Sequence, residues 1–155
     1  MELAIEEAYR RHGHHVLRRA TRLLGNESDA REVLQEVFVS LLANPEQYEG
    51  RAALTTWLYR ATTNACLNRI RDARTRRRIL EASGSPEPAR PGTAPDDAAE
   101  LRRLLVRLPE ELARVAIHYH LDEMTHEEIA SIMGCSRRHI GNLLERVATA
   151  AEDAP

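Results

Sequence analysis

The stretch that decides the fold lies toward the carboxyl end, where residues 125–147 read THEEIASIMGCSRRHIGNLLERV. Thr125 and Glu128 have the spacing of a capping box, in which each residue satisfies an orphan backbone N–H of the other at the start of a helix. Gly134 is suited to a tight turn, and Ser136 is suited to cap the helix that follows. Two short helices joined by such a turn predict a helix-turn-helix.

The second helix of this motif is expected from Arg137 to about Ala148. Its apolar row should be buried and consists of Ile140, Leu143, Leu144 and Val147. The opposite face is polar, and its side chains are suited to contact phosphates or base edges in a major groove. The residues expected to do so are Ser136, Arg137, Arg138, His139, Asn142 and Arg146. An ordinary helical hairpin with a solvated polar face is the alternative.

A proline- and glycine-rich stretch precedes this unit. Residues 83–97 hold four of the seven prolines and two of the seven glycines, a composition that neither continues a helix nor builds a core. We expect a flexible linker there, with one domain at 1–82 and another at 98–150. Helical spacing of apolar residues recurs on both sides, so the fold class is all-α, with two small helical domains.

In the first domain we expect three helices. One runs from about Leu3 to Leu24 and stops at Gly25-Asn26. The next begins near Ser28, ends before Pro45 and has one wide buried face made of two apolar rows. Those rows are Val33, Val37, Leu41 and Leu34, Phe38, Leu42. The third helix covers about 54–80, and its expected inward residues are Leu54, Trp57, Leu58, Ala61, Ala65 and Ile70.

In the second domain, a helix over about 98–107 precedes one that begins at Leu108-Pro109-Glu110, where proline suits the first helical position. That second helix is expected to end where the chain turns, at about 121–124. The helix-turn-helix then follows.

The charge of the chain is unevenly distributed. Its 22 basic residues are all arginine and its net charge is −2. Residues 1–82 hold 14 arginines and 11 acids, whereas residues 99–155 hold 7 and 10. Within the first domain, residues 69–78 hold six arginines and one aspartate. Such a chain can touch phosphate locally, but it is a poor DNA-binding protein on its own.

Several kinds of chemistry are excluded by the residues. The absence of lysine removes lysine-dependent phosphate loops, Schiff bases and general bases. No Gly-x-Ser-x-Gly, His-Glu-x-x-His or glycine-rich phosphate loop occurs, so we expect no enzyme, no catalytic residue and no cofactor. His12 and His15 could face one ion, but His118 and His120 point apart on a helix, and no metal site is expected. Cys66 and Cys135 are expected to be reduced packing thiols.

The first domain contains two stretches that resemble a known family. Residues 29–38, DAREVLQEVF, closely resemble the polymerase-binding helix of bacterial sigma factors of the extracytoplasmic-function group. Residues 53–60, ALTTWLYR, followed by Asn64 and by CLNRIR at 66–71, are similar to the promoter-melting segment of that group. Residues 105–110 and the helix-turn-helix resemble its second DNA-binding domain. The resemblance covers roughly residues 5 to 148.

This resemblance implies partners and sites. Core RNA polymerase would bind the second helix through Asp29, Glu32, Gln35 and Glu36. The minus-ten promoter element would be melted by the helix over 54–78, through Arg60, Asn64, Asn68, Arg69, Arg71 and Arg74. Arg74 would hold phosphate together with Arg76, Arg77 and Arg78. The minus-thirty-five element would be recognised by the helix-turn-helix, and a separate anti-sigma factor would control the protein.

Two positions depart from the family pattern, and one alternative function remains. Gly141-Asn142-Leu143 replaces a more basic stretch, and Asn68 stands where aspartate is common.

The alternative function is a self-sufficient regulator that binds an operator as a dimer, although the acidic second domain disfavours it. The acidic amino terminus lacks signal-peptide features and no apolar run is long enough to span a membrane, so a cytoplasmic location is expected.

Overall fold

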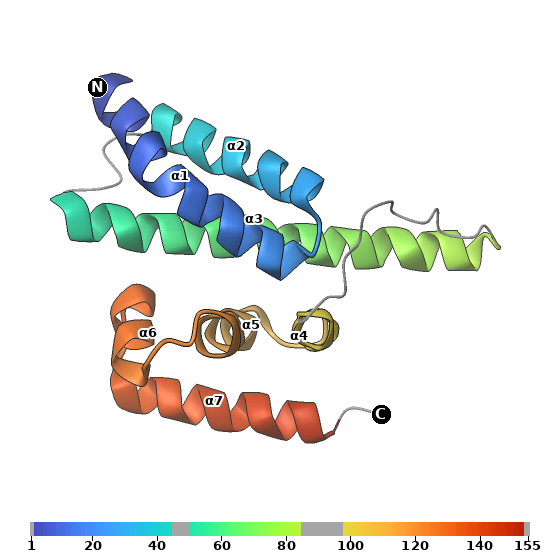
Figure 1. Cartoon of the computed structure of the whole chain (residues 1–155). Coiled ribbons are helices and arrows are strands. Elements are labelled where there is room, and N and C mark those ends of the chain that lie inside the picture. Colours follow the sequence, from blue (N-terminus) through green and yellow to red (C-terminus); the bar gives the residue numbers. More distant parts are fainter. Residues whose placement is uncertain (1, 45–49, 85–97, 154–155) are drawn as a thin grey trace. The chain divides into compact units, whose positions relative to one another are not determined.

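A computed structural model describes residues 2–44, 50–84 and 98–153, and the chain divides into two compact units, Met1–Asp97 and Ala98–Pro155. Both units are built from helices, and the described segments contain no β-strand (Figure 1). The predicted all-α class with two helical domains is therefore confirmed. Residues 85–97, most of the expected linker, lie outside the described residues.

The first unit holds three helices, α1 (Glu2–Leu24), α2 (Glu27–Ala43) and α3 (Gly50–Ala82). Gly25 follows α1 with a φ of 73°, the left-handed conformation that glycine adopts without strain. Asn26 then caps α2, because its side chain accepts a hydrogen bond of 3.0 Å from the backbone N–H of Asp29. The Gly25-Asn26 pair thus ends one helix and begins the next, and α2 starts slightly before the predicted Ser28.

The apolar rows of α2 supply much of the core of the first unit. Val33, Val37 and Leu41 are almost completely buried, and Leu34 and Phe38 are nearly so. The prediction was wrong for Leu42, which is 54% exposed. Leu34 and Phe38 are slightly more exposed than Val33 and Val37, so their row lies at the edge of the buried face. This row leaves the core at Leu42, in the last turn of the helix.

The inward face of α3 differs in part from the predicted one. Leu58, Ala65 and Ile70 are buried as expected, but three other residues expected inside, Leu54, Trp57 and Ala61, are only half-buried. The interior positions are taken instead by Thr62, Thr63, Cys66 and Leu67. Polar threonines therefore lie in the interior where an apolar row was expected.

Arg19 of α1 explains why part of this interface is polar. Its side chain is only 4% exposed, and its Nη2 donates a hydrogen bond of 2.7 Å to Thr63 Oγ1. Its Nη1 donates to the backbone oxygen of Tyr59 at 3.3 Å, and its guanidinium lies 4.9 Å from the centre of the Tyr59 ring. A buried guanidinium needs such partners because desolvation is costly. Arg19 thereby fixes the contact between α1 and α3.

The carboxyl-terminal part of α3 extends beyond α1 and α2 (Figure 1). Every described residue from Arg71 to Gly84 is exposed or half-exposed. The arginine-rich stretch is therefore carried on helix that the first unit does not cover.

The second unit contains α4 (Ala99–Leu105), α5 (Glu110–Ala116), a π-helical turn η2 (Ile117–Leu121), α6 (His126–Met133) and α7 (Arg137–Glu152). Pro109 caps α5 rather than occupying its first turn, and α7 continues to Glu152 instead of about Ala148. Leu144, expected in the buried row of α7, is only half-buried. The other three members of that row, Ile140, Leu143 and Val147, are buried.

The helix-turn-helix has the predicted local geometry. Thr125 and Glu128 form a complete capping box, with hydrogen bonds of 3.0 and 3.1 Å. Gly134 has a φ of 71° and ends α6, and Ser136 Oγ accepts a hydrogen bond of 3.0 Å from the His139 backbone N–H at the start of α7. Helix α6 crosses the beginning of α7 (Figure 1).

The π-helical turn η2 was not predicted. The Asp122 N–H donates to the oxygen of Ile117 at 3.1 Å, five residues back, which widens the helix by one residue. Within this turn His118 is buried, and its Nδ1 lies 3.0 Å from Asp122 Oδ2, whereas His120 is exposed. The two histidines thus point apart, as their spacing predicted.

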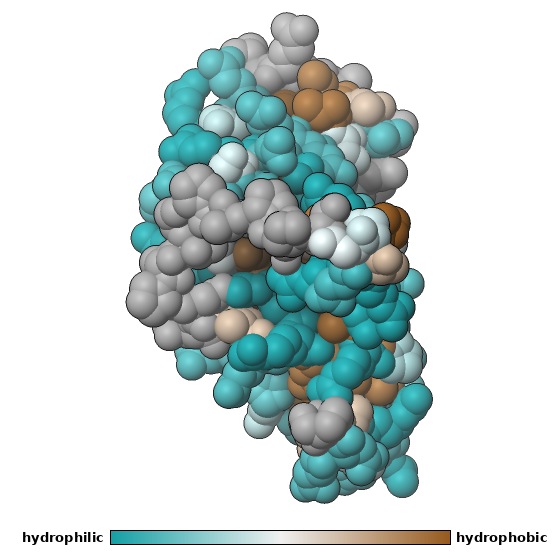
Figure 2. All heavy atoms as spheres, turned by 90° about the vertical axis from the view of Figure 1, so that its right-hand side faces the viewer, coloured by the Kyte–Doolittle hydropathy of each residue, from teal (hydrophilic) through white to brown (hydrophobic). Residues whose placement is uncertain are grey.

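The surface drawn in Figure 2 is largely hydrophilic, and both cysteines are reduced. On the face drawn in Figure 2, hydrophilic residues predominate and hydrophobic ones form small groups. Both cysteines are free, Cys66 fully buried and Cys135 half-buried. Burial, together with the nearby charge of Glu111, raises the pKa of the Cys135 thiol and so reduces its reactivity.

Gly141 offers a test of how well α7 tolerates a side chain. A Cβ there would meet only His126 Nδ1, at an ordinary contact distance of 3.9 Å. We expect Gly141→Ala to raise the free energy of unfolding by about 0.5–1 kcal/mol, because glycine is a poor helix former. Gly134→Ala is the matched control and should lower it by about 1 kcal/mol, since alanine is strained at positive φ. Urea denaturation of the full chain measures both, and a destabilised Gly141→Ala would contradict the prediction.

Candidate functional site

An acidic face runs along the outside of α2. Glu32, Gln35 and Glu36 are exposed, and Asp29 is half-exposed in the first turn. Val33, Val37 and Leu41 are buried on one side of α2. The other three polar residues lie three or four positions from Glu32, on the other side of the helix, so all four polar side chains point outward. A negative charge at Asp29 also suits the amino-terminal end of the helix dipole. We define Asp29, Glu32, Gln35 and Glu36 as the α2 face.

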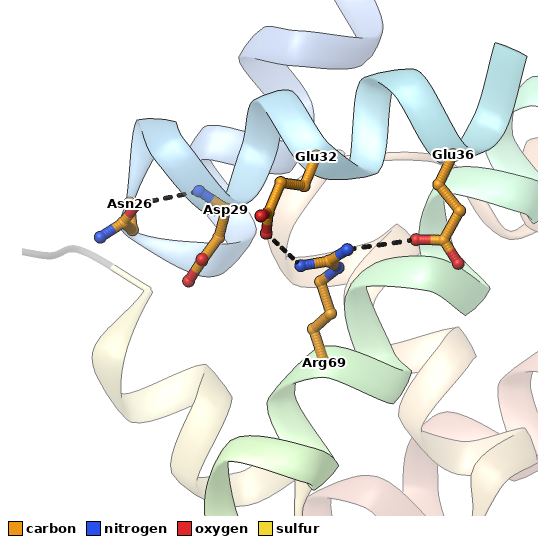
Figure 3. Close-up of polar contacts among 5 residues, drawn as sticks. All are labelled: Asn26, Asp29, Glu32, Glu36 and Arg69. Atoms are coloured by element: carbon orange, nitrogen blue, oxygen red, sulfur yellow. Dashed lines mark hydrogen bonds and ion pairs between the residues drawn. The ribbon is translucent and has the colours of Figure 1, made fainter. Parts of the chain in front are cut away.

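Arg69 of α3 reaches this face and lies between its two glutamates (Figure 3). Arg69 Nη1 lies 2.7 Å from Glu32 Oε2, and Arg69 Nη2 lies 3.5 Å from Glu36 Oε2. Partial burial by itself would lower the pKa of Arg69, but the hydrogen bonds and charges of both glutamates outweigh it and raise that pKa. We call these three residues the Arg69 clamp.

The clamp joins residues that the sequence had assigned to different sites. Glu32 and Glu36 were expected to bind polymerase, and Arg69 was expected to bind DNA. No sequence pattern showed which side of α3 faces α2, so the contact was missed. The spacing of Glu32 and Glu36, one helical turn apart, is the only local signal that a shared cation fits between them.

A second group of predicted residues forms a polar row along α3. Arg60, Asn64 and Asn68 are exposed and follow one another at intervals of four, and half-exposed Arg71 continues the row. These intervals place them on one side of the helix, about a quarter turn from Arg69. We call these four residues the α3 row. Half-exposed Arg74 and exposed Arg76, Arg77 and Arg78 lie on the extension beyond the row.

The polar face of α7 carries the third predicted group. Arg138, Asn142 and Arg146 are exposed and follow one another at intervals of four, and Arg137 is also exposed. Ser136 uses its hydroxyl as the helix cap. His139 differs, because its Nε2 lies 3.1 Å from Glu111 Oε1 of α5, a contact that the sequence did not predict.

The described residues show neither a metal-binding cluster nor a membrane-spanning helix. Within residues 2–44, 50–84 and 98–153, no group of three or more histidine, cysteine or acidic side chains lies together as a metal site would require. None of the helices described is long and apolar enough to cross a bilayer.

Both units match known protein families. The family described as Sigma-70 region 2 matches residues 8–76, and the family described as Sigma-70, region 4 matches residues 98–148. The first match contains the α2 face, the Arg69 clamp and the α3 row. The second contains the helix-turn-helix.

Individual relatives agree with this assignment. The ECF RNA polymerase sigma-E factor of Escherichia coli K12 is 30% identical over 139 residues, covering 80% of this chain and 71% of its own length. The ECF sigma factor SigM of Mycobacterium tuberculosis H37Rv is 28% identical over 148 residues, covering 95% and 73%. The ECF sigma factor SigE of Mycolicibacterium smegmatis is 29% identical, and the match spans about half, 52%, of that relative's length.

A solved structure shows the same fold. The sigma factor RpoE of Bartonella quintana, determined in complex with the anti-sigma factor NepR, matches with a TM-score of 0.53 at 18% identity, over 96% of this chain and 94% of that chain. Helical regions 2 and 4 in one chain define the class of sigma-70-type transcription factors. Within that class, the chain belongs to the extracytoplasmic-function group of RNA polymerase sigma factors. Its relatives are regulators of transcription, in keeping with the expectation that it is not an enzyme.

The unequal distances in the clamp predict unequal coupling. In double-mutant cycles, we expect Glu32 and Arg69 to couple by about 0.5–1 kcal/mol, because their exposed pair is short. Glu36 and Arg69 should couple by less than about 0.3 kcal/mol at their longer distance. Urea denaturation in low and high salt measures both couplings, and salt should reduce them. Equal couplings would contradict the geometry.

The capping box predicts a dependence of stability on pH. The hydrogen bonds to the backbone and side chain of Thr125 lower the pKa of Glu128 below its ordinary value. A depressed folded pKa stabilises the protein above the unfolded pKa, and this contribution is lost as pH falls through the folded pKa. Glu128→Gln keeps the capping hydrogen bonds but removes the group that titrates. When the pH is lowered, the urea midpoint of this variant should therefore fall less than that of the natural protein. Parallel acid profiles would contradict the prediction.

Proposed function

We propose that this protein directs core RNA polymerase to a specific set of promoters. The α2 face binds the polymerase, the α3 row and the arginines beyond it engage the minus-ten element, and the polar face of α7 recognises the minus-thirty-five element. The observation that carries the proposal is the presence of regions 2 and 4 in one chain, each with its polar residues outward. The extracytoplasmic-function family supports the same conclusion.

The charge of the α2 face supports polymerase binding. Its three carboxylates exceed the single Arg69 guanidinium, so the face keeps a net negative charge and would attract basic residues of a partner. Such complementarity speeds association and sets orientation more than it adds raw affinity. The buried rows of α2 hold the face on a regular helix, which fixes the positions of its carboxylates.

The two DNA surfaces are suited to different tasks. Arginine and asparagine on α7 offer bidentate hydrogen bonds to guanine and adenine, so Arg138 and Asn142 are the proposed base-reading residues. On α3, Asn64 and Asn68 offer hydrogen bonds to bases of a separated strand. Arg74, Arg76, Arg77 and Arg78 would hold phosphates without reading sequence.

The modest overall charge fits a protein that acts together with polymerase. A net charge of −2 gives little electrostatic affinity for DNA over the whole chain. When polymerase holds both units on one promoter, two weak contacts act at high effective concentration and become strong together.

A separate anti-sigma factor is the proposed means of control. The Bartonella quintana structure of similar fold contains one, NepR. An inhibitor that covered the α2 face here would block polymerase binding without touching the DNA-binding surfaces.

Run-off transcription tests the proposal. Purified protein and core polymerase, on pooled genomic fragments, should give discrete transcripts that neither component gives alone. Arg138→Ala with Asn142→Ala should reduce them about thirtyfold or more, since each of the two base contacts is worth roughly 1–3 kcal/mol and 1.4 kcal/mol is a factor of ten. Arg103→Ala, an exposed arginine on α4, is the control and should leave transcription unchanged.

The opposite outcome would favour the alternative function. If core polymerase gains no start site, while the protein alone shifts specific DNA, the protein is an operator-binding regulator. If transcripts appear but are unaffected by the double substitution, the assignment of α7 as the reading helix is wrong.

A further inference from the structure

The Arg69 clamp connects the surface proposed for polymerase with the helix proposed for DNA. We infer, on the basis of the proposed function, that Arg69 competes with basic residues of polymerase for Glu32 and Glu36. Docking of polymerase on Glu32 and Glu36 would then release the Arg69 guanidinium to bind DNA beside the α3 row. The clamp thus makes polymerase binding and DNA binding favour each other.

The geometry of the clamp suits a contact that forms and breaks. The side chain of Arg69 is 33% exposed, and those of Glu32 and Glu36 are 60% and 57% exposed. Solvent reaches all three residues, so exchange of partners exposes no buried charge. One bond is short, at 2.7 Å, and the other is marginal, at 3.5 Å. An exposed ion pair of this kind is weak and can be displaced by a competing cation.

The charges explain why polymerase would compete successfully. Two carboxylates share one guanidinium, so the clamp carries a net charge of −1 and Asp29 lies one turn before it. A basic side chain of the partner is therefore attracted even while Arg69 is in place. As that side chain takes over Glu32 and Glu36, the attraction that holds Arg69 declines.

The position of Arg69 explains where the released side chain would go. Its neighbour Asn68 is exposed and belongs to the α3 row. Rotation of the long arginine side chain moves its charge from the α2 side toward this row, and exposed side chains change rotamer rapidly. By linkage, DNA that holds Arg69 also uncovers the glutamates, so it strengthens polymerase binding by the same factor.

A purely structural role for Arg69 predicts a different change in the affinity for polymerase when Arg69 is removed. If the clamp only holds α2 against α3, removing Arg69 should weaken polymerase binding or leave it unchanged. Competition predicts tighter binding, because both glutamates become free for the partner. The sign of the change therefore separates the two roles.

The first experiment measures the affinity of the full chain for core polymerase by fluorescence anisotropy. Arg69→Gln should bind about two- to fivefold more tightly than the natural protein, an effect in the range of an exposed ion pair. Arg22→Gln, an exposed arginine of α1 with the same change of charge, is the control and should give a smaller effect. Equal or weaker binding by Arg69→Gln would overturn the inference.

The second experiment uses a labelled single-stranded DNA pool of random sequence without polymerase. Glu32→Gln with Glu36→Gln mimics release and should tighten DNA binding about two- to fivefold beyond the control pair Glu6→Gln with Glu7→Gln. The control glutamates pair with Arg10 and Arg11 on their own helix, so their removal makes the same charge change without freeing Arg69. Adding Arg69→Gln to the first pair should abolish the gain.

The outcomes distinguish this inference from the proposed function. If the natural protein does not bind polymerase at all, the proposed function fails, and the inference fails with it. If it binds, but both glutamate pairs change DNA affinity equally, or the triple variant keeps the gain, only the inference is overturned. The comparison of the two glutamate pairs does not use Arg69→Gln, so it remains decisive if that substitution impairs folding.

Discussion

The first unit depends on the burial of one face of α2. Val33, Val37 and Leu41 are almost completely buried, and burial of such aliphatic side chains contributes roughly 1.5–3 kcal/mol each. Since the side chains of a helix are fixed relative to one another, burial of this row also turns the carboxylates of Glu32 and Glu36 outward. The hydrophobic effect therefore sets the direction of the acidic face, although it does not act on the acidic residues themselves.

The two units position their polar residues by different means. In the first, long helices are held by side chains distant in sequence, such as Arg19 on Thr63 and Arg69 on Glu32. In the second, α6 begins at the local cap Thr125 and α7 at the local cap Ser136. Helix α6 has only 8 residues, and so short a helix is marginal by itself, so its cap contributes more to its stability. The position of the polar face of α7 consequently depends on residues close to it in the sequence. The Arg69 clamp depends on residues of two helices that are far apart in the sequence.

This difference explains which features could be predicted from the sequence. The capping box, the turn at Gly134 and the cap at Ser136 involve residues at most four positions apart, and all were predicted. The interior position of Thr63 was missed because its partner Arg19 is more than forty residues away. The π-turn at Ile117–Leu121 was missed because no residue type requires it. The family and the two helical domains followed from motif order, but the pairing of Glu32 with Arg69 needed the packed structure.

The length of α3 has a consequence for the proposed minus-ten contact. Arg60 and Arg78 lie at the two ends of its polar stretch, and a rise of 1.5 Å per residue separates them by about 27 Å along the helix axis. B-form DNA rises about 3.4 Å per step, so this distance corresponds to about eight nucleotides. Because the backbone hydrogen bonds of one continuous helix fix its rise per residue, they also fix the distance between these arginines. If the α3 row and the arginines beyond it contact DNA as proposed, helix geometry sets the length of DNA that the first unit can contact.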